Sequence, residues 1–184
     1  MTARMPKHNP RRHRSSQSPD VDPYRSDEKL PEPAACPDCG AVLHRGRWTW
    51  MSAPEDADPV RCPACRRIAD GVPAGVLTVK GPFYHVKADE LLKLIQHVAE
   101  RTAKEHPLAR ILRIETERNG ATISTTDKHL IQGIGDALRQ AFPGSLTLNF
   151  FKQQPFARAT FWLRDGEAVS KERERLSGGP RRHP

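Results

Sequence analysis

Hydrophobic residues are scarce in this chain of 184 residues, and none of their runs is long. They make up 36% of the sequence, and the mean hydropathy is -0.68. No apolar run approaches the roughly 18 residues that cross a bilayer, so the sequence predicts a soluble, cytoplasmic protein without a membrane partner. The low apolar content and the seventeen prolines also indicate that part of the chain stays outside any core.

Patterns that carry catalysis are missing as well. The sequence has no nucleotide-binding loop, no serine-nucleophile elbow and no paired carboxylates. Asp127 and His129 could be taken for a catalytic pair, but residues two apart on a helix do not face each other. Thr126 or Asp127 is better explained as the cap of a helix that starts there. We therefore expect a protein that is not an enzyme.

Only four cysteines are present, and they form two matched pairs, Cys36 with Cys39 and Cys62 with Cys65. Each pair encloses a proline and one further residue, a gap that lets both thiolates reach one metal ion. Two such pairs supply the tetrahedral Cys₄ shell of a structural zinc site. Because thiolates would fill all four positions, the zinc would hold a fold together without activating water.

Two other uses of these cysteines are weaker. Disulfides suit small secreted domains, but no apolar signal segment precedes the first pair. A thioredoxin-like redox site would need its cysteine pair beside a βαβ pattern, which neither pair has. The sequence therefore favours a metal site.

Basic residues outnumber acidic ones, and the net charge of +8 favours an anionic partner such as RNA. The excess is unevenly spread, since residues 36–72 carry five basic and five acidic side chains. Residues 73–163 carry twelve and eight. The segment around the cysteines is thus neutral, which suits a protein partner, and half of the excess lies beyond it.

Changes in composition divide the chain into four parts. Residues 1–34 are predicted to be a disordered tail rich in proline and basic residues, and 165–184 a charged disordered tail. Between them we expect a zinc ribbon over 35–72 and an α+β domain over 73–164. The basic start of the chain could be an arm for phosphates or merely a solvated terminus, and both remain open.

The periodicity of the second domain predicts the order α-β-β-α-β-β. Leu91, Leu94, Ile95 and Val98 keep helical spacing within an expected helix over 88–105. The other expected elements are strands over 111–117 and 121–125 joined by a type I′ turn at Asn119-Gly120, a helix over 127–141, and strands over 145–151 and 156–164. We expect these to form one antiparallel four-stranded sheet with both helices on one face.

Two shorter stretches are also extended in this interpretation. Residues 43–50 alternate and are expected to form one strand of the ribbon, with Trp48 and Trp50 on the same side. Residues 76–79 are expected to form a short strand within a linker that covers 71–81.

Aromatic and basic side chains alternate with apolar ones along the last strands. We expect the helices to be faced by Leu146, Leu148 and Phe150 on one strand and by Ala157, Ala159, Phe161 and Leu163 on the next. The opposite face then carries aromatic rings and arginines, a combination that binds single-stranded nucleic acid. The candidate residues for this contact are Arg113, Phe151, Arg158, Trp162 and Arg164. The alternative is that this face packs against the ribbon or another subunit.

Several motifs together carry a family resemblance. These are the Cys-Pro-x-Cys pairs and the segments 72–75, 106–111 and 125–130. Over residues 36–164 they resemble an uncharacterised family of small bacterial zinc-ribbon proteins. The last motif and the last two strands are also similar to part of the archaeal and eukaryotic large-ribosomal-subunit export adaptor family.

The resemblance implies a zinc ribbon beside a small α/β domain. In the adaptor family such parts contact ribosomal RNA and proteins, which implies RNA or the ribosome as a partner. The chain departs from the adaptor pattern because it holds only one Cys₄ set and has no counterpart of the adaptor's larger C-terminal domains.

Two functions therefore remain open. The first is a non-catalytic zinc-ribbon protein that binds RNA or the ribosome. The second is a zinc-stabilised adaptor between proteins, in which the neutral ribbon is the docking module and nucleic acid has no role.

Overall fold

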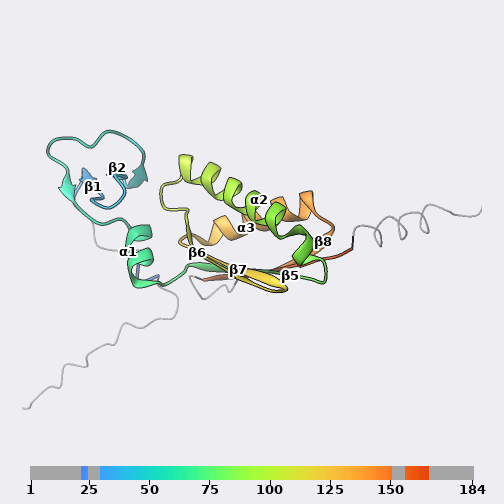
Figure 1. The fold of residues 1–184 in the computed structure, drawn as a ribbon. Coiled ribbons are helices and arrows are strands. Elements are labelled where there is room, and N and C mark those ends of the chain that lie inside the picture. The colour runs from blue at the N-terminus through green and yellow to red at the C-terminus, as the bar shows by residue number, and fades with distance from the viewer. Residues whose placement is uncertain (1–21, 25–29, 151–155, 166–184) are drawn as a thin grey trace, which may run out of the picture.

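The computed structural model of this chain describes residues 22–24, 30–150 and 156–165. They form two modules, each built around its own sheet (Figure 1). The cysteine module, residues 34–71, has a small four-stranded sheet and one helix. The sheet module, residues 74–165, has a five-stranded sheet and two helices. The chain is thus an α+β protein, as predicted.

Very short strands form the sheet of the cysteine module. Its order is β3-β2-β1-β4, with β1 antiparallel to β2 and parallel to β4. The strands are β1 (Ala34–Ala35), β2 (Val42–His44), β3 (Arg47–Thr49) and β4 (Asp58–Pro59). The prediction of a single strand over 43–50 is wrong, because the chain reverses there. Arg45 and Gly46 have φ of 50° and 74°, as a two-residue type I′ turn requires.

An eight-residue helix that the sequence analysis missed, α1 (Pro63–Asp70), begins within the second cysteine pair. Cys62 is its N-cap, and Pro63 takes the first helical position, where a missing N–H costs nothing. Gly71 ends the helix with φ 67°, the left-handed conformation that suits glycine at this place.

Part of the predicted N-terminal tail contacts this helix. The Tyr24 hydroxyl donates to Asp70 at 2.8 Å, and the guanidinium of Arg67 lies 4.3 Å from the centre of the Tyr24 ring. Asp22 forms an ion pair with Arg67, which is buried. Of the other tail residues, 1–21, 25–29 and 166–184 lie outside the described part of the chain.

The sheet module differs from the predicted antiparallel four-stranded sheet. Its order is β6-β7-β5-β9-β8, and the central pair β5 and β9 is parallel. The strands are β5 (Gly75–Lys80), β6 (Ile111–Glu117), β7 (Gly120–Thr125), β8 (Gly144–Phe150) and β9 (Ala157–Leu163). Residues 76–79, predicted to be a short strand within a linker, thus belong to the central strand β5. Leu77 and Val79 are fully buried there, between the neighbouring strands β7 and β9.

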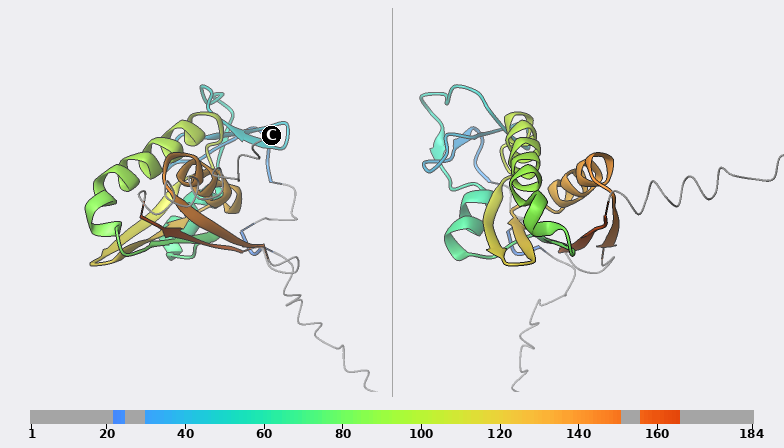
Figure 2. Two further views of the ribbon diagram at one scale, coloured as in Figure 1. Left: turned by 90° about the vertical axis from the view of Figure 1, so that its right-hand side faces the viewer. Right: turned by 45° about the vertical axis from the view of Figure 1, so that its right-hand side comes forward.

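Both helices lie side by side over one face of this sheet, as predicted (Figure 1 and both views of Figure 2). They are α2 (Tyr84–Glu105) and α3 (Lys128–Ala141). Helix α2 starts four residues earlier than predicted. The core between helices and sheet includes Leu91, Ile95, Ile123, Ile134, Leu138 and Phe161.

The β6–β7 hairpin forms where the sequence predicts it, but its turn differs. Glu117 pairs with Gly120, so the loop residues are Arg118 and Asn119, and neither has the positive φ of a type I′ turn. Gly120 instead allows a close approach between strands, since a Cβ there would lie 2.7 Å from the carbonyl oxygen of Val79.

A bulge in β6 changes which side chains enter the core. The pairing of β6 with β7 shifts between Ile111 and Arg113. Ile111 and Ile114 therefore pack on the core, while Leu112 between them is outside that cluster. None of the described helices is long and apolar enough to span a bilayer.

Candidate metal centre and the open sheet face

The first cysteine pair lies in a tight turn directly after β1. The Cys36 N–H donates to the Ala41 carbonyl at 2.8 Å, and the Gly40 N–H donates to the Cys36 carbonyl at 2.9 Å. Gly40 closes the turn with φ 75°. This backbone arrangement holds the two thiols of the pair on the same side of the loop.

The second pair is held by the start of α1. The Cys62 N–H donates to Cys36 Sγ at 3.3 Å, and the Cys65 N–H donates to Cys62 Sγ at 3.4 Å. Backbone N–H groups thus point at the sulfurs from both pairs, an arrangement that stabilises thiolates.

The four sulfurs form one compact cluster that could hold a metal ion. All four Sγ atoms lie within 4.8 Å of one another, and Cys39 and Cys62 are 3.8 Å apart. That separation exceeds the roughly 2.05 Å of a disulfide, and the cysteines are free. It equals the roughly 3.8 Å between corners of a tetrahedron whose centre lies about 2.3 Å from each sulfur. The cluster is therefore compatible with an ion held by all four sulfurs.

Protonation of the cluster is uneven. Burial opposes ionisation of Cys36, yet the N–H groups of Cys62, Asp38 and Cys39 lower its pKa to about 7. Burial raises the pKa of Cys62 and of Cys65. A bound cation would favour the ionised form of the buried Cys62 and Cys65.

Arg110, which the sequence analysis did not single out as a site residue, reaches the cluster from the sheet module. Its Nη2 lies 3.3 Å from Cys62 Sγ, 3.4 Å from Cys39 Sγ and 3.5 Å from Cys65 Sγ. Burial works against its charge, but the hydrogen bond to Cys65 and the nearby sulfurs raise the pKa of Arg110. No spacing rule could have found it, because it lies 45 residues beyond Cys65.

Two further contacts join the modules near the cluster. Leu108 and Trp48 pack against the buried cysteines. The Trp50 indole Nε1 donates to the Ala103 carbonyl of α2 at 2.6 Å. Trp50 thus helps to place the cysteine module on the sheet module, although 44% of Trp50 stays exposed, whereas Trp48 packs within its own module.

The sheet face opposite the helices carries most of the predicted nucleic-acid residues. The alternation along β9 buries Ala157, Ala159, Phe161 and Leu163, as predicted, and leaves Arg158 and Trp162 on the open face. Arg113 pairs through Ser124 and Val76 with Arg158, so both arginines lie in one row across the sheet. Three strand spacings separate them by about 14 Å.

The other two predicted contacts stand apart from this row. Arg164 follows β9 and is exposed, and its N–H donates to the Pro143 carbonyl at 2.9 Å. Phe151 lies outside the described residues.

Cations on the open face lie over aromatic rings. Lys80 Nζ is 5.7 Å from the centre of the Trp162 ring, and the Arg158 guanidinium is 5.6 Å from that of Phe156. The Trp162 side of this face also has hydroxyl groups, because Thr78, Thr122 and Thr160 form a row across three strands. Lys80 and Phe156 were not predicted as contacts.

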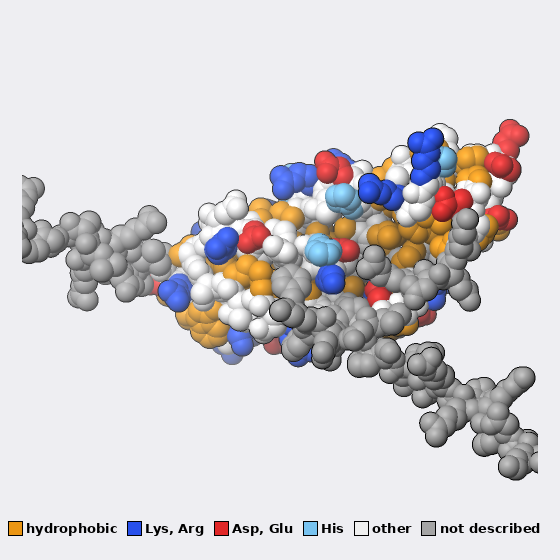
Figure 3. Space-filling model, turned by 180° about the vertical axis from the view of Figure 1, so that it is seen from behind, with side chains coloured by type: hydrophobic (Ala, Val, Ile, Leu, Met, Phe, Trp, Pro, Cys, Tyr) orange, Lys and Arg blue, Asp and Glu red, His pale blue; other side chains and the backbone are white. Residues whose placement is uncertain are grey.

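The charge on this face is not uniform. Arg113 forms an exposed ion pair with Glu115 at 3.2 Å, and Glu117 lies on the same edge strand. Within the described residues, the cations of this face that form no ion pair, Lys80 and Arg158, therefore lie on β5 and β9 rather than on β6. Seen from behind, the molecule shows basic, acidic and apolar side chains interspersed (Figure 3).

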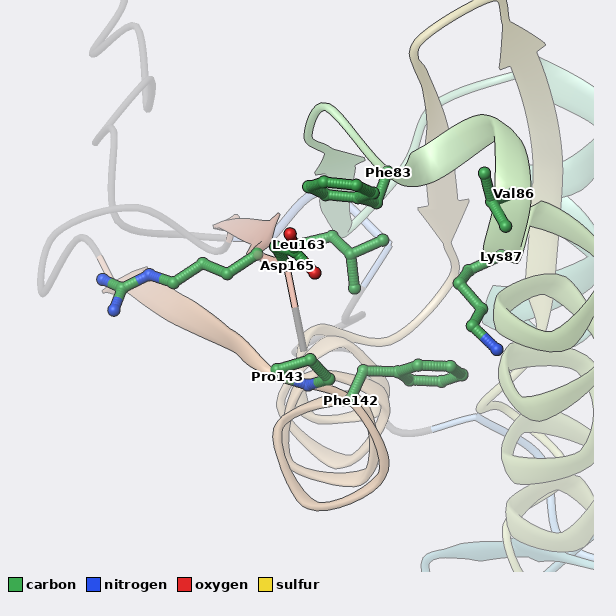
Figure 4. A pocket seen from close by; sticks show the side chains of 8 residues that line it. Phe83, Val86, Lys87, Phe142, Pro143, Leu163 and Asp165 are labelled. Carbon is green, nitrogen blue, oxygen red and sulfur yellow. The ribbon is translucent and has the colours of Figure 1, made fainter. Parts of the chain in front are cut away.

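An apolar hollow of about 210 Å³ lies at the end of the sheet module where α2 starts and α3 ends. Figure 4 shows Phe83, Val86, Phe142 and Leu163 around it, with Lys87 at its rim. Phe83 and Val86 are 37% and 64% exposed, large values for apolar side chains. No pattern in the sequence predicts this hollow.

The polar segment before α3 has a structural role. Asp127 Oδ1 accepts from the N–H groups of His129 and Leu130 at 2.7 and 3.1 Å, so the predicted cap is confirmed. The carboxylate of the supposed catalytic pair is therefore occupied by the helix start.

Comparison with family models, curated proteins and solved structures finds no match for this chain.

Proposed function

We propose that this chain is a non-catalytic RNA-binding protein whose cysteine module is stabilised by zinc. RNA would lie on the open face of the sheet module over β5 and β9. The observation that carries the proposal is the pairing of cations with rings there, Lys80 with Trp162 and Arg158 with Phe156. Bases stack on rings and guanidiniums, while the charges attract phosphates.

The geometry favours a single strand over a duplex. Phe156 lies just before β9 and six residues from Trp162, or about 20 Å at the rise of a strand. Only unpaired bases can stack on rings that stand on a flat sheet. The hydroxyls between the two rings add hydrogen-bond partners for bases or sugars. Ribosomal RNA is one source of such unpaired segments.

Zinc is the metal that the donor set supports best. Four sulfurs in a tetrahedral arrangement favour zinc or iron, and zinc holds structural sites without redox chemistry. With all four corners occupied by sulfur, the ion has no position for a substrate or an activated water. This supports a role in folding.

Binding of fluorescently labelled single-stranded RNA, followed by anisotropy at several salt concentrations, tests the RNA proposal. Trp162→Ala should cost about 1–3 kcal/mol of binding, because one stacking ring is lost. Arg158→Ala should weaken binding and lower the salt slope by about 1. Arg139→Ala, which removes an exposed arginine of α3, is the matched control. Equal binding by all three variants and the unaltered protein would refute the proposed face.

One observation favours the alternative of a protein adaptor, namely the apolar hollow beside the exposed Phe83 and Val86. Val86→Asp separates the two functions, because this side chain lines the hollow, whereas Arg158 and Trp162 lie on the open face of the sheet. If the adaptor function holds, binding of a co-purified partner protein persists after nuclease treatment. Val86→Asp then abolishes this binding, and Arg158→Ala leaves it unchanged. The RNA function predicts the reverse dependence.

A further inference from the structure

We infer that the metal centre has a fifth protein group, the guanidinium of Arg110, which acts as a positioning residue for the four cysteines. Its Nη2 is within 3.5 Å of three of the four sulfurs. A single N–H-bearing nitrogen over three sulfurs covers one triangular face of the cluster. The inference rests on the proposed zinc site and concerns a residue outside the metal-binding motif.

Several hydrogen bonds aim the guanidinium at the sulfurs. Arg110 Nε donates to the Pro107 carbonyl at 2.8 Å, which leaves Nη2 free to point at the cysteines. The Arg110 backbone N–H donates to Thr126 Oγ1 at 3.0 Å, and Thr126 is buried. The Thr126 hydroxyl in turn donates to the Leu108 carbonyl at 2.7 Å. The arginine is therefore held by the sheet module before it meets the cluster.

Charge gives the guanidinium a function there. Four thiolates around a divalent ion carry a net charge of −2, and burying that charge is costly unless it is compensated. Arg110 supplies one positive charge and N–H donors to the sulfurs, and such outer-shell groups orient and stabilise metal ligands. Cys62, which accepts the shortest of these contacts, is fully buried and depends most on a partner inside the protein.

The contact also joins the two modules. Arg110 stands just before β6, whereas all its sulfur partners belong to the cysteine module. Leu108 packs on the same cluster from the same segment. Bound metal would thus fix how the cysteine module sits on the sheet module, and loss of the metal would release Arg110 and its neighbours at once.

Zinc affinity measured by competition with a chromophoric chelator tests this inference. Arg110→Met keeps the length and apolar stem but removes the charge and the donors, and should weaken zinc binding by about 10-fold to 100-fold. Arg110→Lys keeps the charge without the planar fork and should fall between. Arg118→Met removes an exposed arginine of the β6–β7 loop and serves as the control. It should bind zinc like the unaltered protein.

A second measurement covers the case in which Arg110→Met does not fold. Amide hydrogen exchange of the full chain with and without zinc should show faster exchange at 103–111 after zinc removal, while the core of β5 and β9 stays protected. Equal zinc affinity for Arg110→Met and Arg118→Met, or exchange at 103–111 that ignores zinc, would overturn the inference. A failure of the zinc site itself is recognised separately, because the unaltered protein would then hold no zinc.

Discussion

The cysteine module buries four residues in its cluster, three of them cysteines, whereas the sheet module buries seventeen around its core. In the first, strands of two or three residues supply few ladder hydrogen bonds and little apolar area. In the second, Leu77, Phe161 and their neighbours are fully removed from solvent. Because burial of apolar surface is the main driving force of folding, only the sheet module has the means to fold by itself. We therefore expect the cysteine module to depend on a bound ion.

The largest expected effect separates the modules by removing the metal. Cys62→Ser should abolish zinc binding and unfold the cysteine module, since metal binding supplies about 10–16 kcal/mol in comparable small zinc domains. The sheet module should remain folded. Zinc content by elemental analysis and the dispersion of NMR amide signals from each module measure both outcomes.

Ala53→Ser introduces the same residue at an exposed site of the same module and should change neither quantity. If Cys62→Ser also unfolded the sheet module, the two modules would form one cooperative unit and the comparison would fail.

The converse test destabilises the sheet module by truncating a side chain in its core. Phe161→Ala should lower the free energy of unfolding of the sheet module by about 3–5 kcal/mol, because it leaves a cavity where a fully buried ring stood. Urea denaturation followed by circular dichroism gives the loss. Zinc should still bind at one equivalent.

The control for this change is Phe83→Ala, since that ring is 37% exposed and loses less contact area than the fully buried Phe161. Should the two alanine variants be equally stable, the core would not be the source of stability assigned to it.

A smaller effect concerns two glycines of α3 that differ only in their surroundings. Gly133→Ala should stabilise the sheet module by about 1 kcal/mol, because a Cβ there meets nothing within 4 Å and alanine favours the helix. Gly135→Ala should gain less or destabilise, because its Cβ would lie 2.9 Å from both Cδ atoms of Leu146. Thermal unfolding of the two variants side by side measures the difference. Equal melting temperatures would contradict the close packing of α3 on β8.

Local patterns predicted the elements whose causes are local. The spacing within the cysteine pairs placed four sulfurs together, and the helical repeat from Leu91 to Val98 placed α2 against the sheet. Turns were less predictable, because the loop at Arg118 and Asn119 is set by how closely Gly120 must approach Val79. The short helix after Cys62 was not predicted, because its N-cap is a cysteine that was assigned to the metal motif.

The sequence by itself determined which residues can hold an ion, where the main helices lie, and which side chains of β9 face outward, because these follow from spacing and periodicity along a single segment. Only the tertiary structure decided that β5 lies at the centre beside a parallel β9, and that Arg110 reaches the cysteines. The strand pairing and the arginine contact each join segments that are far apart in the chain. Such contacts form only in the folded protein, and no local sequence pattern predicts them.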